Sequence, residues 1–258
     1  MNWASARCIS LLAASLSGCA ALPPPPAGFQ LFTEDTRIWH EAGGEREAAR
    51  VAGLLDAAVT RVEYVHGMPF SRPPRVHICV TQACFRRLVS GEGYTAAVVP
   101  GDRLILSPLL FGRELTRLPG ILTHELSHLH LGQRLGHYTP WLPVWFHEGL
   151  ATLAAEGGGA EFASDGEARG AWLEGRQVDF GRRDVPGRRH RADDYGLTTQ
   201  EFYRQSWRFV EYLRNRDPGA FTGMLRAIQS GTDITISVAD AYNSSLERLG
   251  HDFGAAGR

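Results

Sequence analysis

Apolar side chains in the first third of the chain recur first with a helical period and then with the period of strands. Over residues 45–66 they fall at three- and four-residue steps, the spacing of one buried face of an amphipathic helix. Residues 75–80 alternate between polar and apolar side chains, as a strand does. Two more strand-like runs, 95–99 and 103–106, flank the turn sequence Pro100-Gly101-Asp102. This region is therefore predicted to hold a helix and a small sheet that includes a hairpin.

The chain beyond Pro119 is predicted to be almost entirely helical. Helical spacing occupies residues 199–214 and 218–229 and is weaker over 238–249. A small N-terminal β-sheet followed by a mostly helical half predicts an α+β fold.

Regular periodicity fades between residues 157 and 194, and we interpret most of this stretch as an insertion or long loop. It begins with three glycines. Its second half carries a cluster of arginines: Arg182, Arg183, Arg188, Arg189 and Arg191. We expect the cluster to be solvated, with binding to anionic lipid or cell-envelope polymers as the alternative.

Composition excludes one class of partner. The 258 residues, of which 43% are hydrophobic, are enough to bury a substantial core. Lysine and arginine number 27 against 28 acidic residues, so the formal net charge is only −1. Because nothing in this balance attracts a polyanion, no nucleic-acid partner is expected.

The N-terminus has the pattern of a secretion signal. Arg7 precedes an apolar run over residues 9–16, which is too short to span a bilayer but has the size of a signal-peptide core. Residues 16–19 read Leu-Ser-Gly-Cys and resemble a bacterial lipobox, which implies removal of residues 1–18 and a lipid on Cys19. A chance cysteine after an apolar N-terminus is the alternative.

A lipid on Cys19 would hold the protein to a membrane surface without a transmembrane helix. Residue 20 is alanine, and by resemblance to sorting signals the lack of an aspartate there favours the periplasmic face of the outer membrane. Residues 23–26 are four prolines, which form a stiff spacer. We therefore divide the chain into a signal peptide (1–18), an anchor and proline-rich linker (19–30) and one domain (31–258).

Two cysteines lie within the domain. In an oxidising compartment Cys79 and Cys84 could form a disulfide. They could equally be two small buried side chains at the end of a strand.

The segment with most chemical content is His124-Glu125-Leu126-Ser127-His128, an HExxH motif within a helical apolar pattern. Residues four apart lie on the same face of a helix, so both imidazoles can reach one metal ion with the glutamate beside them. Pro119 suits the first turn of this helix and Gly136 its exit. A second predicted helix begins near Pro143 and carries Glu148, with nineteen residues separating it from His128.

The HExxH motif followed by Glu148-Gly149-Leu150-Ala151 resembles the gluzincin metallopeptidases, in which a second helix carries a glutamate ligand in an EGxA setting. The resemblance implies a zincin-like fold, Zn²⁺ held by His124, His128 and Glu148, and Glu125 as general base. The substrate would be a peptide or protein. A metzincin would instead have glycine at position 131 and histidine at 134, where this chain has leucine and arginine. His137 and His147 remain alternative ligands.

The resemblance extends less specifically to two further features. Tyr203 resembles the tyrosine that hydrogen-bonds the oxyanion in aminopeptidase-like members; Tyr195 competes for this role, and simple packing of Tyr203 is the other alternative. The strand at 103–106 would be an edge strand that pairs with extended substrate. Aminopeptidase-like members bind the free amino terminus of a substrate through a GxMxN segment upstream of the HExxH motif. This chain has no such segment, so aminopeptidase activity is not expected.

These observations predict a zinc metallopeptidase anchored at the cell envelope. A catalytically inactive zincin-fold binding or scaffold lipoprotein is the first alternative. The second is a chance HExxH motif in a purely structural helical domain, which leaves Glu148 unexplained. Metal analysis and a Glu125→Gln comparison separate the three.

Overall fold

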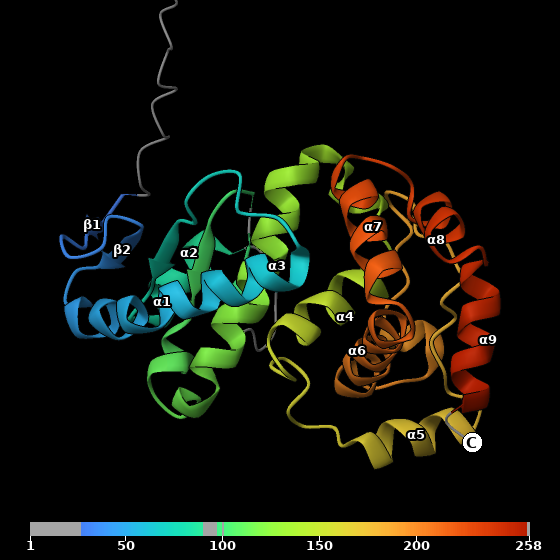
Figure 1. The fold of residues 1–258 in the computed structure, drawn as a ribbon. Coiled ribbons are helices and arrows are strands. Elements are labelled where there is room, and N and C mark those ends of the chain that lie inside the picture. The colour runs from blue at the N-terminus through green and yellow to red at the C-terminus, as the bar shows by residue number, and fades with distance from the viewer. Residues whose placement is uncertain (1–26, 90–96, 100, 257–258) are drawn as a thin grey trace, which may run out of the picture.

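The computed structural model describes residues 27–89, 97–99 and 101–256, and it has an α+β fold in which a small mixed sheet precedes a mostly helical half (Figure 1). The proposed signal peptide, Cys19 and the four prolines lie outside the described residues. The strands are β1 (Phe29–Leu31), β2 (Ile38–Glu41), β3 (Val76–Ile78), β4 (Ala97–Val98) and β5 (Leu104–Leu106). Their order in the sheet is β1-β2-β3-β5-β4, and β1 begins inside the range assigned to the linker.

The first helix, α1 (Glu45–His66), has the predicted bounds. Its apolar stripe, which includes Val51, Leu55 and Val62, is fully buried in one core with side chains of the sheet such as Val76. Because β2 and β3 are parallel, their connection must cross over the sheet, and α1 makes that crossing. The long helix predicted at residues 45–66 is therefore the crossover connection that the parallel pair requires.

The predicted hairpin is present, but its arms are arranged differently from our expectation. β4 and β5 pair antiparallel, while β5 also pairs with β3 on its other side. The expectation that 103–106 forms an edge strand is therefore wrong, because hydrogen bonds to both neighbours occupy its backbone. The edge of the sheet on this side is β4.

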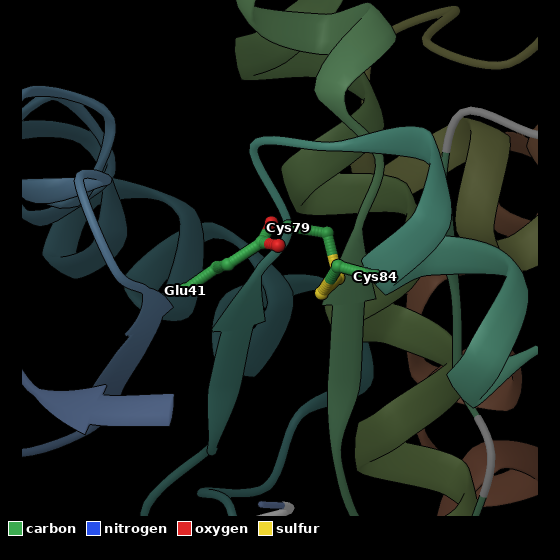
Figure 2. A group of neighbouring side chains, drawn as sticks. All are labelled: Glu41, Cys79 and Cys84. Carbon is green, nitrogen blue, oxygen red and sulfur yellow. A yellow bond between two sulfur atoms is a disulfide. The ribbon is translucent and has the colours of Figure 1, made fainter. Parts of the chain in front are cut away.

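A short helix, α2 (Gln82–Leu88), follows β3, and a disulfide joins Cys79 to Cys84 across the turn between them (Figure 2). The two cysteines form a small apolar cluster with Phe85 and Ile105 that is separate from the main core. Of the two alternatives for these cysteines, the disulfide is therefore the one present.

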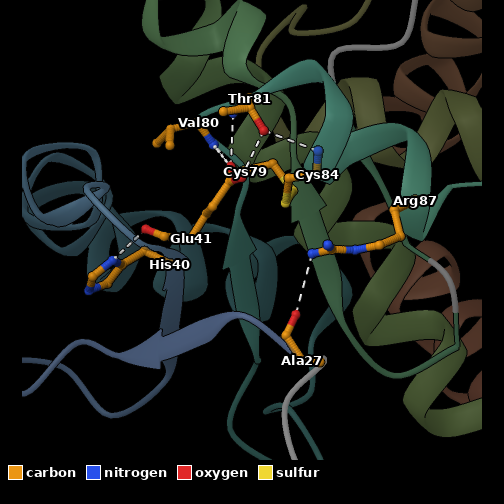
Figure 3. The surroundings of a disulfide bond; sticks show 8 residues. All are labelled: Ala27, His40, Glu41, Cys79, Val80, Thr81, Cys84 and Arg87. Atoms are coloured by element: carbon orange, nitrogen blue, oxygen red, sulfur yellow. Dashed lines mark hydrogen bonds between the residues drawn. A yellow bond between two sulfur atoms is a disulfide. The ribbon is translucent and has the colours of Figure 1, made fainter.

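Glu41 lies beside the disulfide and organises the same turn (Figure 3). Its carboxylate accepts hydrogen bonds from the backbone N–H groups of Val80 and Thr81, both at 2.9 Å. The Thr81 hydroxyl adds a third bond at 2.7 Å and also caps α2. Although Glu41 and the two sulfurs are close together, sulfurs bonded to each other offer no thiolate, so this group is not a metal site.

The helical half contains the HExxH helix and six further α-helices within the described residues. They are α3 (Leu118–Leu135), α4 (Val144–Ala154), α5 (Asp165–Leu173), α6 (Thr199–Arg216), α7 (Pro218–Gln229), α8 (Ile234–Tyr242) and α9 (Leu246–Ala256). Short 3₁₀ turns are η1 (Pro108–Phe111), η2 (Leu115–Arg117), η3 (Gly136–Trp141) and η4 (Ala192–Tyr195). The predictions for α6 and α7 are confirmed. The weak helix at 238–249 is instead two helices, because Asn243 adopts a left-handed conformation that ends α8.

The stretch from 157 to 194 is packed more closely than we expected of a long loop. It contains α5, which a capping box of Ser164 and Glu167 starts. Gln205, buried on α6, forms hydrogen bonds with the backbone of this stretch. Its amide oxygen accepts from the N–H of Val178 at 3.0 Å, and its amide nitrogen donates to the carbonyl oxygens of Ala168 and Arg176. Side chains satisfy this backbone in place of a regular ladder, which is why the sequence shows no period here.

Among the described helices, none is long and apolar enough to cross a membrane.

Candidate metal centre

Helix α3 places the two histidines of the HExxH motif one turn apart on the same face. Pro119 lies in its first turn and Gly136 ends it with a positive φ of 52°, as predicted. The rings of His124 and His128 meet edge to face with centroids 4.8 Å apart. Their Nε2 atoms are 3.1 Å apart, so both nitrogens point to one spot.

Helix α4 brings a carboxylate to the same spot. The Oε2 atom of Glu148 lies 3.2 Å from His124 Nε2 and 3.4 Å from His128 Nε2. Among the described residues these three side chains form a group that could hold a metal ion, and they are the three that the sequence predicted. Burial by itself would raise the pKa of Glu148, but the two histidines hold it well below its usual range.

The outer nitrogen of His124 determines which form this ring takes. His124 Nδ1 lies 2.9 Å from the carbonyl oxygen of Gly158, which can only accept, so Nδ1 carries the hydrogen. In the neutral ring Nε2 then has a lone pair directed at Glu148. Burial lowers the pKa of His124, but its hydrogen bond to Glu148 raises the pKa above the ordinary value. A proton and a metal cation therefore compete for the same lone pair.

The glycine run at residues 157–159, after α4, packs against the ring of His124, a role that sequence reasoning missed. A Cβ on Gly159, whose φ is +93°, would lie 2.7 Å from His124 Nδ1. A Cβ on Gly158 would lie 2.7 Å from the backbone of Gly120 on α3. Side chains are therefore excluded at both positions, because the loop passes directly behind the histidine. Three consecutive glycines were the available signal.

His128 is oriented by a third histidine. Its Nδ1 lies 2.8 Å from Nδ1 of His147, so one ring donates and the other accepts. Burial lowers the pKa of His147 to about 3, so this ring is neutral. In the tautomer in which its Nδ1 accepts from His128 Nδ1–H, the Nε2 of His128 keeps its lone pair. His147 is thus the hydrogen-bond partner of His128 and not a member of the group. His137 lines the cleft from η3, is exposed, and also lies outside the group.

A cleft of about 940 Å³ opens over these residues, and Glu125, His128, Glu148 and Tyr203 line it. Burial raises the pKa of Glu125 above its usual value. The ring of Tyr203 stacks on that of His124, with centroids 5.8 Å apart and planes at 17°. Burial and then the charge of Glu148 raise the pKa of Tyr203 well above 10, so its hydroxyl keeps its proton.

Tyr195, the competing candidate, is placed elsewhere. Its ring stacks on Phe202 with centroids 6.0 Å apart, and it is not among the residues that line the cleft. Burial raises the pKa of its hydroxyl to about 12.

Gly149 allows α4 to lie close enough to α6 for the cleft to form. A Cβ at this position would lie 2.5 Å from the carbonyl oxygen of Ser206 and 2.8 Å from Val210 Cγ2. The glycine of the EGxA setting is therefore required by helix packing, directly beside Glu148.

The segment that follows α5 holds the start of α4 in place through Asp184. The buried carboxylate of Asp184 accepts from the backbone N–H of Val144, at the start of α4, at 2.8 Å. It also accepts from the backbone N–H and from Nδ1 of His190, at 2.9 and 2.7 Å. Arg189 and Arg191, on either side of His190, line the cleft. Sequence reasoning placed these arginines in a solvated loop; Arg191 is exposed there, but the side chain of Arg189 is only 28% exposed.

Comparison with known proteins adds no assignment: no protein-family profile matches the chain, and no curated protein matches it.

Proposed function

We propose that the protein is a zinc-dependent metallopeptidase of the gluzincin type, with a zincin-like fold. The observation that carries the proposal is the convergence of His124, His128 and Glu148, from two helices, on one point beside a cleft. Two imidazoles and a carboxylate with an open fourth position are the ligand set of catalytic zinc sites.

The distances between the donor atoms support zinc. Bonds of about 2.0 to 2.1 Å in a tetrahedral arrangement put neighbouring ligand atoms roughly 3.3 Å apart. The three separations here are 3.1, 3.2 and 3.4 Å. Three acceptor atoms this close repel one another unless a cation lies between them, and the hydrogen bond to the Gly158 carbonyl leaves Nε2 of His124 free to bind one.

Bound zinc would acidify a water molecule and polarise a peptide carbonyl. The remaining steps belong to the protein. Glu125, at the cleft wall beside the ligands, takes the proton of the attacking water and passes it to the departing amine. Tyr203, protonated and stacked on His124, donates a hydrogen bond to the developing oxyanion.

The outer edge of β4 is the surface on which we propose that substrate binds. Val99 and Gly101, which follow β4, line the cleft, and no described strand pairs with the outer side of β4. An extended peptide can add there as a further strand, which recognises main chain more than side chains. The lipid on Cys19 and the location at the periplasmic face of the outer membrane remain part of the proposal on the N-terminal sequence alone.

A catalytically inactive scaffold is the second candidate. It has in its favour only that the resemblance to the gluzincins is loose outside residues 124–151. The matched pair of wild type and Glu125→Gln decides between the two. We expect both to bind zinc and only wild type to cleave a peptide library read by mass spectrometry. Equal products from both proteins would refute the role of Glu125, and no cleavage by zinc-loaded wild type would favour the scaffold.

A further inference from the structure

A short arm of the chain presents two arginines to the cleft. The arm is residues 184–191, in which Val185 and Arg188 form an isolated β-bridge. Asp184 fastens both ends, because its carboxylate binds the start of α4 and the backbone and ring of His190. With His190 turned into the interior, its neighbours Arg189 and Arg191 both line the cleft.

One long ion pair compensates the positive charge of Arg189 only in part. The nearest carboxylate to Arg189 is Asp184, whose Oδ2 is 3.8 Å from Nε, too long for a hydrogen bond. Asp184 already accepts three hydrogen bonds from other groups. The Nη2 of Arg189 donates to the Leu142 carbonyl oxygen at 2.8 Å. Its Nε–H has no partner within the described chain.

Arg191 forms no ion pair with any described residue, although Asp193 also lines the cleft. Burial lowers the pKa of Arg189, the carboxylate of Asp184 opposes that shift, and the charge of Arg191 adds to it. Two like charges held together beside a substrate cleft are stabilised when an anion binds between them.

We propose that Arg189 and Arg191 form a carboxylate-binding subsite of the cleft, so that the enzyme prefers peptides with a carboxylate close to the scissile bond. That carboxylate is either the free C-terminus of the peptide or the side chain of aspartate or glutamate. The proposal rests on the proposed peptidase function.

The test uses the full-chain, zinc-loaded protein and three pools of N-acetylated peptides with the same randomised core. One pool has a free C-terminal carboxyl, one a C-terminal amide, and one an amide together with a single fixed glutamate. We expect one of the two carboxylate pools to be cleaved with a kcat/KM roughly tenfold to a hundredfold above the neutral pool. The pool that responds identifies the source of the carboxylate.

Variants assign the preference to the subsite. Arg191→Gln should reduce the ratio between carboxylate and neutral pools to near one, and Arg191→Glu should invert it. Arg188→Gln is the matched control, because Arg188 belongs to the same arm, is exposed and does not line the cleft. An equal kcat/KM for all pools in wild type would overturn the proposal, as would an equal loss of the ratio in Arg188→Gln and Arg191→Gln.

Binding separates this proposal from the peptidase assignment. The Glu125→Gln protein is titrated with the three pools, each carrying an uncharged fluorophore, with and without the Arg191→Gln change. Tighter binding of a carboxylate pool that depends on Arg191, with no cleavage by wild type, would leave the subsite standing and refute the peptidase. Cleavage of all pools without preference would refute the subsite alone.

Discussion

Replacement of Gly149 by alanine should weaken both the fold and the metal site. In a helix interior alanine is favoured over glycine by about 1 kcal/mol. Here that gain is outweighed, because the new Cβ would lie 2.5 Å from the Ser206 carbonyl oxygen and 2.7 Å from its carbon. Those atoms are backbone, so α4 and α6 must separate by several tenths of an ångström. Overpacking of this kind costs about 1 to 3 kcal/mol, and with a rigid neighbour we expect the upper half of that range.

The net destabilisation expected for Gly149→Ala is therefore about 1 to 2 kcal/mol. Because Glu148 precedes this residue, its carboxylate moves away from the two histidines. We expect zinc affinity to fall roughly tenfold to a hundredfold, as it does when the support of a metal ligand is lost. Urea denaturation measures the first effect, and competition with a chelator measures the second.

Gly53→Ala is the control for this change. Gly53 lies within α1 and is exposed, and a Cβ there would meet nothing within 4 Å. This variant should be more stable than wild type by about 1 kcal/mol and should bind zinc equally well. If Gly149→Ala were stabilised to the same extent with unchanged zinc affinity, the close approach of α4 to α6 would be refuted.

Three further predictions follow from buried groups outside the metal centre. Burial lowers the pKa of His77 to about 4, whereas an unfolded histidine has about 6.5, so the unfolded chain binds the proton more readily. The stability of wild type should therefore fall by about 3 kcal/mol more than that of His77→Phe as the pH drops from 6.5 towards 4, and denaturation curves of the two proteins measure this. A difference between them that stays constant over this range would contradict it. Gln205→Leu removes three hydrogen bonds to the backbone of the 157–194 segment, so we expect a loss of about 3 kcal/mol in the free energy of unfolding, and a loss below about 1 kcal/mol would disprove that Gln205 holds this segment in place. The double change of Cys79 and Cys84 to alanine opens a loop of sequence separation 5 and should cost about 2 kcal/mol without altering zinc content; a loss of zinc would show that the disulfide supports the centre.

The parts of the molecule that the sequence predicts are those set by local pattern. The apolar spacing of α1 and the Pro119 and Gly136 boundaries of α3 are local signals, and the structure follows them. The meeting of His124 and His128 was predicted because helix geometry places residues four apart on one face, whereas Glu148 was predicted from the resemblance of its EGxA setting.

What the sequence does not predict depends on contacts between distant segments. The order of the short strands β4 and β5 depends on which neighbour each one finds, and the hairpin pattern is the same for either order. The hydrogen bond from the Val144 N–H, at the start of α4, to Asp184 joins residues 40 positions apart, and no local pattern marks it. Gly158 and His147 orient the two histidine ligands in the same way, through contacts that exist only after α3 and α4 have packed.

The central claim is that His124, His128 and Glu148 hold zinc, and elemental analysis of the purified protein tests it most directly. Wild type is measured beside three single variants: His124→Ala, Glu125→Gln and His137→Ala. The last is the matched control, because His137 also lines the cleft but lies outside the ligand group. We predict one zinc per chain in wild type, Glu125→Gln and His137→Ala, and none in His124→Ala. Folded wild-type protein without tightly held metal, or zinc retained by His124→Ala, would contradict the account.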